Sequence, residues 1–167
     1  MIRPHNNGFV YNENEIIKMK RSISLASEYQ PKGVVFGGLT KDCKIDFKKN
    51  EELLLHAKSL NLECTFHRAF DSCIKPIQSF KEIKALGFDW LLTSGQEATA
   101  EIGIPLLKKL NNLKNDKIKI LAGGGISPNN CHKFKLIEMD GIHFSIDKNQ
   151  TVEQQKIKNI LNQLSIN

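Results

Sequence analysis

The feature that most constrains the fold is a regular alternation of short apolar runs with longer amphipathic stretches. The apolar runs start roughly 23 to 31 residues apart, which is the length of one strand, one helix and their loops. This alternation predicts an α/β fold with a parallel sheet. The predicted strands are residues 33–36, 64–67, 89–93, 118–122 and 141–145.

Between the predicted strands, apolar residues recur every three or four positions, as in helices that bury one face. Ile16, Met19 and Ile23 follow this spacing, and so do Leu53 and Ala57. Hydrophobic residues make up 40% of the chain and charged residues 25%, which is enough for a sizeable core. No linker or second compositional zone interrupts the pattern. We therefore expect residues 1–167 to form a single domain.

The composition also limits the classes of binding partner that we expect for this chain. The net charge is +6, but the lysines are scattered along helix-like segments and form no stripe with aromatic residues, so we expect no nucleic-acid partner. No apolar run approaches the roughly 20 residues of a membrane span, and no signal segment opens the chain, so we expect no membrane partner. The four cysteines contain no C-x-x-C pair. Such cysteines are typical of reduced thiols in the cytoplasm.

A glycine cluster indicates which α/β fold this is. Gly123, Gly124 and Gly125 follow the penultimate predicted strand. Phosphate-binding loops follow strands seven and eight in a TIM (β/α)₈ barrel, whereas open sheets carry theirs after the first strand. Residues 1–4 predict the end of one further strand. We therefore expect an incomplete TIM barrel that lacks about its first two βα units, since a barrel takes roughly 250 residues. Its unpaired strand edges predict that the chain alone is either poorly soluble or self-associates, with a homo-oligomer as one outcome.

The densest polar cluster lies at the end of the second predicted strand. Strand alternation directs His67 into the barrel near its C-terminal mouth, and Arg68 and Asp71 follow in the loop. A histidine, a guanidinium and a carboxylate at this position can bind an anion or move a proton, so these three are candidate catalytic residues. The alternative is an Arg68–Asp71 ion pair that braces the loop around a hydrogen-bonded interior histidine. The sequence favours neither.

Other residues at the predicted mouth are candidate anion ligands. Arg3 ends the partial strand, although a frayed cation near a terminus is the slightly favoured interpretation. Ser94 follows the third strand, where its hydroxyl either binds a ligand or caps a turn. Gly123–Gly125 precede a helix predicted to begin at Ser127–Pro128, so their backbone N–H groups form either an anion cradle or only a tight turn.

Metal ligands are harder to identify. Cys43 and Cys73 are the one cysteine pair that the predicted loops place at the same mouth, and two thiols suit soft Cu(I). Cys64 begins its strand and lies on the order of 20 Å from Cys73, because about six extended residues separate them. The sequence therefore leaves the metal site unknown.

Several motifs together carry a family resemblance. They are MIRP at residues 1–4, GVVFG-x-LT at 33–40, TFHRAFD at 65–71, LLTSG at 91–95 and GGGI at 123–126. In this order they resemble the CutC family of copper homeostasis proteins, from residue 1 to about residue 146. The resemblance implies a TIM barrel, a cytoplasmic location and copper as the bound ion. It also implies that the cysteines usually credited with copper binding belong to βα units ahead of residue 1. His5 and Asn6-Asn7 depart from the family pattern, which has an arginine and a glycine there.

Two functions therefore remain open. The first is a CutC-family protein that takes part in copper homeostasis and binds copper. The second is a TIM-barrel enzyme or binding protein for a small phosphorylated or carboxylated metabolite. It would use His67 as acid or base, Arg68 and Arg3 as anion ligands, and Gly123–Gly125 as the phosphate cradle. Whether the chain catalyses a reaction is left open by the residues alone.

Overall fold

The computed structural model shows two compact units. That these units together form a single domain stays a prediction. The first unit comprises residues 1–92 and 114–119, and the second comprises residues 93–113 and 120–167. The residues that the structure describes are 1–114, 116–148, 151–152 and 154–165.

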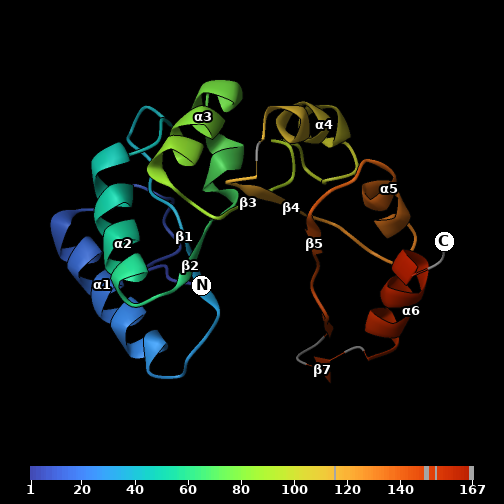
Figure 1. The fold of residues 1–167 in the computed structure, drawn as a ribbon, viewed down its shortest axis with the longest axis horizontal. Helices are drawn as coiled ribbons and strands as arrows, with labels where there is room; N and C mark the ends of the chain where they lie inside the picture. The colour runs from blue at the N-terminus through green and yellow to red at the C-terminus, as the bar shows by residue number, and fades with distance from the viewer. Residues whose placement is uncertain (115, 149–150, 153, 166–167) are drawn as a thin grey trace. The chain divides into compact units, whose positions relative to one another are not determined.

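The first unit is a run of alternating helices and parallel strands (Figure 1). Its elements are α1 (Glu13–Ser27), β1 (Gly33–Phe36), α2 (Phe47–Ser59), β2 (Glu63–Phe66), the 3₁₀ helix η1 (Arg68–Ser72), α3 (Pro76–Leu86) and β3 (Trp90–Thr93). β2 lies between β1 and β3, with Val34 opposite Cys64 and Thr65 opposite Trp90. The predicted parallel βα alternation is confirmed here, because a helix separates each strand from the next.

The helices of the first unit form where the apolar spacing predicts them. Ile16, Met19 and Ile23 are all buried on one face of α1. That helix begins with a capping box, in which Asn12 accepts from the backbone N–H of Glu15 and the Glu15 carboxylate accepts from that of Asn12. Figure 1 shows α1 and α2 side by side next to the β1–β2 pair.

Aromatic rings and one carboxylate hold the strands of this unit in place. The Phe88 ring packs against those of Phe36 and Phe66, with centroids 5.2 and 5.3 Å away. Asp89, just before β3, accepts from the backbone N–H of Cys64 at 2.6 Å and pairs with Lys58 Nζ at 2.5 Å. These contacts fix the register of β2 and β3, so the residues at the ends of the strands occupy defined positions.

The first eleven residues run past the C-terminal end of β1. The Ile2 backbone N–H donates to the Val35 carbonyl at 2.8 Å, and the Leu39 N–H donates to the Phe9 carbonyl at 2.8 Å. Residues 1–4 therefore lie beside β1, but they form no strand. The prediction that residues 1–4 form the end of a strand is wrong. Pro4 has no backbone N–H, so it cannot extend a ladder of hydrogen bonds along β1.

The second unit contains the remaining elements. They are α4 (Ile104–Leu113), β4 (Lys119–Gly123), α5 (Cys131–Leu136), β5 (Gly141–His143), β6 (Asp147–Lys148), β7 (Thr151–Val152) and α6 (Gln154–Ser165). β4 and β5 are parallel, with Ala122 opposite Ile142, and β6 and β7 form a short antiparallel pair. α5 packs against α6. Among the described helices of the chain, none combines the length and apolarity required to cross a membrane.

Candidate functional site

His67 sits at the end of β2, where backbone contacts hold it firmly. Its backbone N–H donates to the Phe36 carbonyl at 3.1 Å, and the side chain caps η1 by accepting from the Ala69 N–H through Nδ1 at 3.2 Å. The ring is 2% exposed and lies 5.0 Å from the Phe9 ring and 6.0 Å from the Phe66 ring, centroid to centroid. The prediction that Arg68 leaves strand geometry is confirmed, because Arg68 begins η1.

Burial controls the protonation of His67. Loss of hydration lowers its pKa to about 4, and the nearby Arg3 cation and the terminal amine of Met1 act in the same direction. The ring is therefore neutral at physiological pH. Since Nδ1 accepts a hydrogen bond, the proton resides on Nε2. Within the described part of the chain, that Nε2 atom is buried and has no hydrogen-bond partner.

Arg3 lies in the same neighbourhood and is held by its own loop. One guanidinium nitrogen, Nη2, donates to the carbonyls of Asn6 and Gly8 at 3.3 Å each. The guanidinium carbon lies 4.6 Å from the centre of the Phe9 ring, a cation–π arrangement. These contacts hold the Arg3 side chain in place, whereas the sequence slightly favoured a frayed cation near the terminus. Among the described residues, Arg3 Nε is buried and also lacks a partner.

Tyr11 belongs to this cluster, although no sequence pattern singled it out. Its side chain is 2% exposed, and its ring lies 5.4 Å from that of His5. Burial raises the pKa of Tyr11, and the neighbouring Arg3 guanidinium partly opposes that shift. Arg3 thus lies close to the phenol. The buried Tyr11 hydroxyl has no hydrogen-bond partner among the described residues. An aromatic residue in a loop carries no periodic signal that would reveal it.

Arg68 and Asp71 form the ion pair that was one of the two alternatives from the sequence. Arg68 Nε lies 2.7 Å from Asp71 Oδ2, within the single turn of η1. The Asp71 side chain is 12% exposed and that of Arg68 is 42% exposed. The pair therefore braces the loop after β2, and a catalytic role for either residue stays a prediction.

In the second unit, Ser94 stabilises the loop that follows β3. Its hydroxyl donates to the Glu97 carbonyl at 2.6 Å, and Thr93 Oγ1 accepts from the Gly95 N–H at 2.9 Å. A Cβ atom on Gly103 would stand 1.8 Å from the Ser94 carbonyl oxygen, so the loop closes tightly on itself. Ser94 thus makes a turn-capping contact, one of its two predicted roles, and ligand binding by this residue stays a prediction.

One backbone and one side-chain hydrogen bond hold the glycine loop after β4. The Gly124 carbonyl accepts from the Ala100 N–H at 2.8 Å, and the Gly125 carbonyl accepts from Asn130 Nδ2 at 3.1 Å. Gly124 and Gly125 have φ values of 126° and 70°, in the region that favours glycine. The tight turn is therefore present at Gly123–Gly125, and anion binding there stays a prediction.

The helix after this loop starts later than predicted. α5 begins at Cys131 with Asn130 as its N-cap, whereas Ser127–Pro128 were expected to begin it. Asn130 Oδ1 accepts from the Ser127 N–H at 2.8 Å, so residues 127–130 form a separate turn. That N–H is consequently occupied, and the loop has one donor fewer for an anion than the sequence suggested.

The cysteines are free thiols, mostly buried. The Ile74 N–H donates to the Cys43 carbonyl at 3.3 Å, so the loops carrying Cys43 and Cys73 adjoin as expected. Burial raises the pKa of Cys73 to about 11 and that of Cys64 to about 12. Across the described ranges, no three His, Cys, Asp or Glu side chains gather as metal ligands.

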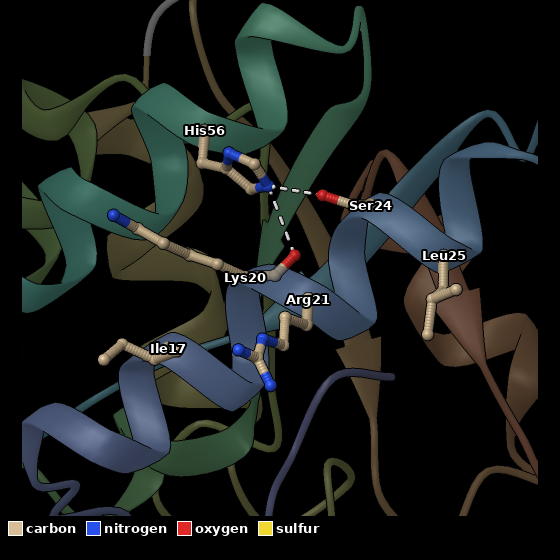
Figure 2. Close-up of a pocket in the computed structure, with 6 residues that line it drawn as sticks. All are labelled: Ile17, Lys20, Arg21, Ser24, Leu25 and His56. Atoms are coloured by element: carbon tan, nitrogen blue, oxygen red, sulfur yellow. Dashed lines mark hydrogen bonds between the residues drawn. The ribbon is translucent and has the colours of Figure 1, made fainter.

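A hollow of about 470 Å³ opens on the surface of the first unit, where His56 of α2 meets α1. Figure 2 shows His56 reaching toward Ser24 and the backbone of Lys20, while Ile17 and Leu25 extend elsewhere along α1. His56 Nε2 lies 2.9 Å from Ser24 Oγ and 3.2 Å from the Lys20 carbonyl oxygen. The histidine therefore joins α2 to α1. Of the buried unpartnered side-chain atoms in the described part of the chain, none belongs to a residue that lines this hollow.

Comparisons with known proteins identify the family. A protein named CutC from Bacteroides fragilis is 42% identical over 146 residues, which cover 87% of this chain and 57% of that protein. Its namesake from Histophilus somni is 38% identical over 159 residues, covering 95% and 63%. This chain thus spans little more than half the length of these relatives.

The fold agrees with a solved structure. A CutC crystal structure from Streptococcus agalactiae, named for a proposed role in copper homeostasis, matches with a TM-score of 0.79 and 32% identity, covering 86% of this chain and 70% of the other. This match confirms the predicted TIM-barrel type of fold. The CutC family model matches residues 1–148, and the chain therefore belongs to the CutC family.

Proposed function

We propose that this protein binds a small anionic metabolite, carboxylated or phosphorylated, at the cluster formed by Arg3, Phe9, Tyr11 and His67. The observation that carries the proposal is the pair of buried donors, Arg3 Nε and His67 Nε2, which have no acceptor among the described residues. Buried donors without partners cost roughly 1–3 kcal/mol each. A ligand that supplies acceptor oxygens would recover that free energy, and a guanidinium favours an anion.

The position in the fold supports this proposal. The cluster forms where β1 and β2 end, since His67 follows β2 directly and the Phe9 carbonyl bonds to Leu39 just beyond β1. In TIM barrels, ligands bind at the C-terminal ends of the strands. Arg68 and Asp71, which follow His67 in η1, complete the proposed set of residues in this unit. Ser94 and Gly123–Gly125 belong to the second unit, and anion binding by them is a separate proposal.

The chemistry of His67 favours polarisation over proton transfer. A general base at neutral pH needs a pKa near 7, whereas burial holds the His67 pKa at about 4. A neutral imidazole with its proton on Nε2 donates to an oxygen and stabilises negative charge that develops there. We therefore propose that His67 donates to a ligand oxygen and polarises it. This role suits an enzyme and a binding protein equally.

The experiment is ligand-induced thermal stabilisation of the full chain. Acetate, inorganic phosphate and glycerol 3-phosphate would be tested at fixed ionic strength against the wild type, Arg3→Gln and Arg21→Gln. Arg21 is the matched control because it is an exposed arginine on α1. We expect at least one anion to raise Tm in the wild type and in Arg21→Gln, but not in Arg3→Gln. Equal responses of the three proteins would refute the proposal.

Copper homeostasis is the second candidate function, with Cu(I) as the cargo. The proposed location is the cytoplasm, where free cysteines such as these stay reduced. The adjoining loops of Cys43 and Cys73 favour it, because thiolates bind soft Cu(I). The donors fit poorly, however, since burial keeps the Cys73 thiol protonated at neutral pH. The described residues hold two neighbouring thiols and no third ligand beside them.

An anaerobic Cu(I) titration with a competing chromophoric chelator tests this second candidate. A protein that carries copper through these thiols would bind one Cu(I). It would lose the ion in the Cys43→Ser/Cys73→Ser double variant but not in Cys131→Ser, which removes a buried thiol of the second unit. Absence of uptake by the wild-type chain would exclude direct binding by these cysteines.

A further inference from the structure

Unpartnered buried polar atoms are concentrated in one place in the described structure. Four side-chain nitrogen or oxygen atoms are buried without a hydrogen bond: Arg3 Nε, Tyr11 Oη, His67 Nε2 and Asn111 Oδ1. The first three belong to Arg3 and to two residues near it, Tyr11 and His67, and all three atoms carry a hydrogen that can be donated. Buried polar groups are nearly always satisfied in folded proteins. Three such donors in one neighbourhood indicate that a ligand with several acceptor atoms belongs there.

Tyr11 is fixed well enough to act as one of these donors. Its ring packs 5.4 Å from the His5 ring, and His5 Nε2 in turn lies 3.1 Å from Glu15 Oε1 at the start of α1. The backbone carbonyl of Tyr11 accepts from Lys49 Nζ at 2.6 Å. Both the ring and the backbone are therefore anchored, while the hydroxyl is left without a partner in the described chain.

The local charges limit the charge of the ligand. The cationic side chain of the cluster is Arg3. The nearby carboxylate is that of Glu15, which accepts from the Asn12 N–H and pairs with His5 at the start of α1. Arg68 and Asp71, next along the chain, neutralise each other, and His67 is neutral through its Ala69 hydrogen bond and its burial. Arg3 is thus the one cationic side chain among these residues with an unpartnered donor, and it presents a single positive charge to the ligand. A monoanion balances it, whereas a dianion would leave one negative charge uncompensated in a buried place.

We propose that Tyr11 is a third ligand-binding residue beside Arg3 and His67, and that the cluster binds the carboxylate of a small monoanion in preference to a phosphate dianion. This inference rests on the proposed function and makes it more specific. The Arg3 guanidinium balances the carboxylate charge, because its Nη2 already serves the Asn6 and Gly8 carbonyls and its Nε is left to face the ligand. The Tyr11 hydroxyl and the His67 imidazole donate without adding charge, which suits a ligand with one negative charge.

The test is a pair of NMR titrations of the ¹⁵N-labelled full chain, with sodium acetate and with sodium phosphate at pH 8 and equal ionic strength. The variants are Tyr11→Phe, which keeps the ring that packs on His5, and Tyr29→Phe as the control, because Tyr29 is 86% exposed. We expect acetate to bind the wild type about tenfold more tightly than phosphate, since one uncompensated charge opposes the dianion. Tyr11→Phe should weaken acetate binding about tenfold, the usual effect of one lost hydrogen bond. Tyr29→Phe should leave it unchanged.

The contrary outcomes separate this inference from the proposed function. Tighter binding of phosphate than acetate, abolished by Arg3→Gln, would overturn the preference for a carboxylate while supporting an anion site. Unchanged acetate affinity in Tyr11→Phe would overturn the assignment of Tyr11. Failure of both anions to bind the wild type, together with the absence of any thermal stabilisation, would overturn the proposed function itself.

Discussion

The backbone N–H of Ala69 donates to Nδ1 of His67 at 3.2 Å, so the proton of this buried imidazole resides on Nε2. This contact determines what the cluster can do. A histidine held as a neutral donor beside Arg3 recognises an acceptor oxygen and does not collect protons at neutral pH.

The pH dependence of stability should reveal the buried His67. Its pKa is about 4 in the folded chain and about 6.5 when unfolded, so between these values the unfolded state binds the extra proton. The free energy of unfolding should therefore fall as pH drops from 6.5 to 4, by up to about 3 kcal/mol. Urea denaturation at pH 7 and pH 4.5 measures this loss. His67→Gln should reduce the loss and the exposed His143→Gln should retain it; an equal loss in both would contradict the assignment.

Gly37→Ala should displace the His67 ring. A Cβ atom at Gly37 would lie 3.0 Å from His67 Nδ1 and 2.9 Å from Phe66 Cζ, whereas one at Gly38 would meet nothing closer than 3.6 Å. Gly37→Ala should cost about 1–3 kcal/mol, as overpacking of a core usually does, and should shift the His67 imidazole resonances. Gly38→Ala is the control and should do neither. Identical unfolding midpoints for the two variants would contradict this prediction, because the Cβ atom at position 37 would then not strain the contact with His67 and Phe66.

Asn50→Asp should destabilise the loop after β1. Asn50 Nδ2 donates to the carbonyls of Gly38 and Asp46, and its Oδ1 accepts from the Gly38 N–H at 2.8 Å. An aspartate of the same shape cannot donate to those carbonyls when ionised, so we expect a loss of about 1–3 kcal/mol or more. Asn14→Asp, at an exposed position in the first turn of α1, should be close to neutral. Chemical denaturation compares them, and similar stabilities would contradict the role of Asn50.

Gly103→Ala should disrupt the loop that carries Ser94. The added Cβ atom would stand 1.8 Å from the Ser94 carbonyl oxygen, a distance that forces the backbone apart. We expect a loss of several kcal/mol or failure of the second unit to fold. Ala98→Ser adds one atom at an exposed position of the same loop and should be tolerated. A Gly103→Ala protein with wild-type thermal unfolding would show that the loop closes less tightly than described.

The sequence predicted the regular elements well because periodicity reports burial. The strand expected at residues 33–36 matches β1, and that expected at 64–67 is shifted by one residue from β2. Ile142 and His143 lie in β5, but the predicted extension to residue 145 does not form. The short β6–β7 pair was not anticipated, since two-residue strands carry no periodic signal.

The site was only partly predictable, for a physical reason. His67 and Arg3 could be identified because strand ends and motifs mark them. Tyr11 could not, because loop closure places it in the cluster and no spacing rule records loop closure. The start of α5 at Cys131 was also missed, since Asn130 bonds the Ser127 N–H and converts the expected helix start into a turn.

The central claim is that Arg3 and His67 bind the same small anion, and one titration tests it directly. The ¹⁵N resonances of Arg3 Nε and His67 Nε2 would be followed in the full chain at pH 7 as sodium acetate replaces sodium chloride at constant ionic strength. The account predicts that both resonances shift along saturable curves with a single dissociation constant. A saturable shift of one resonance while the other stays in place, or the absence of saturation in both, would contradict it.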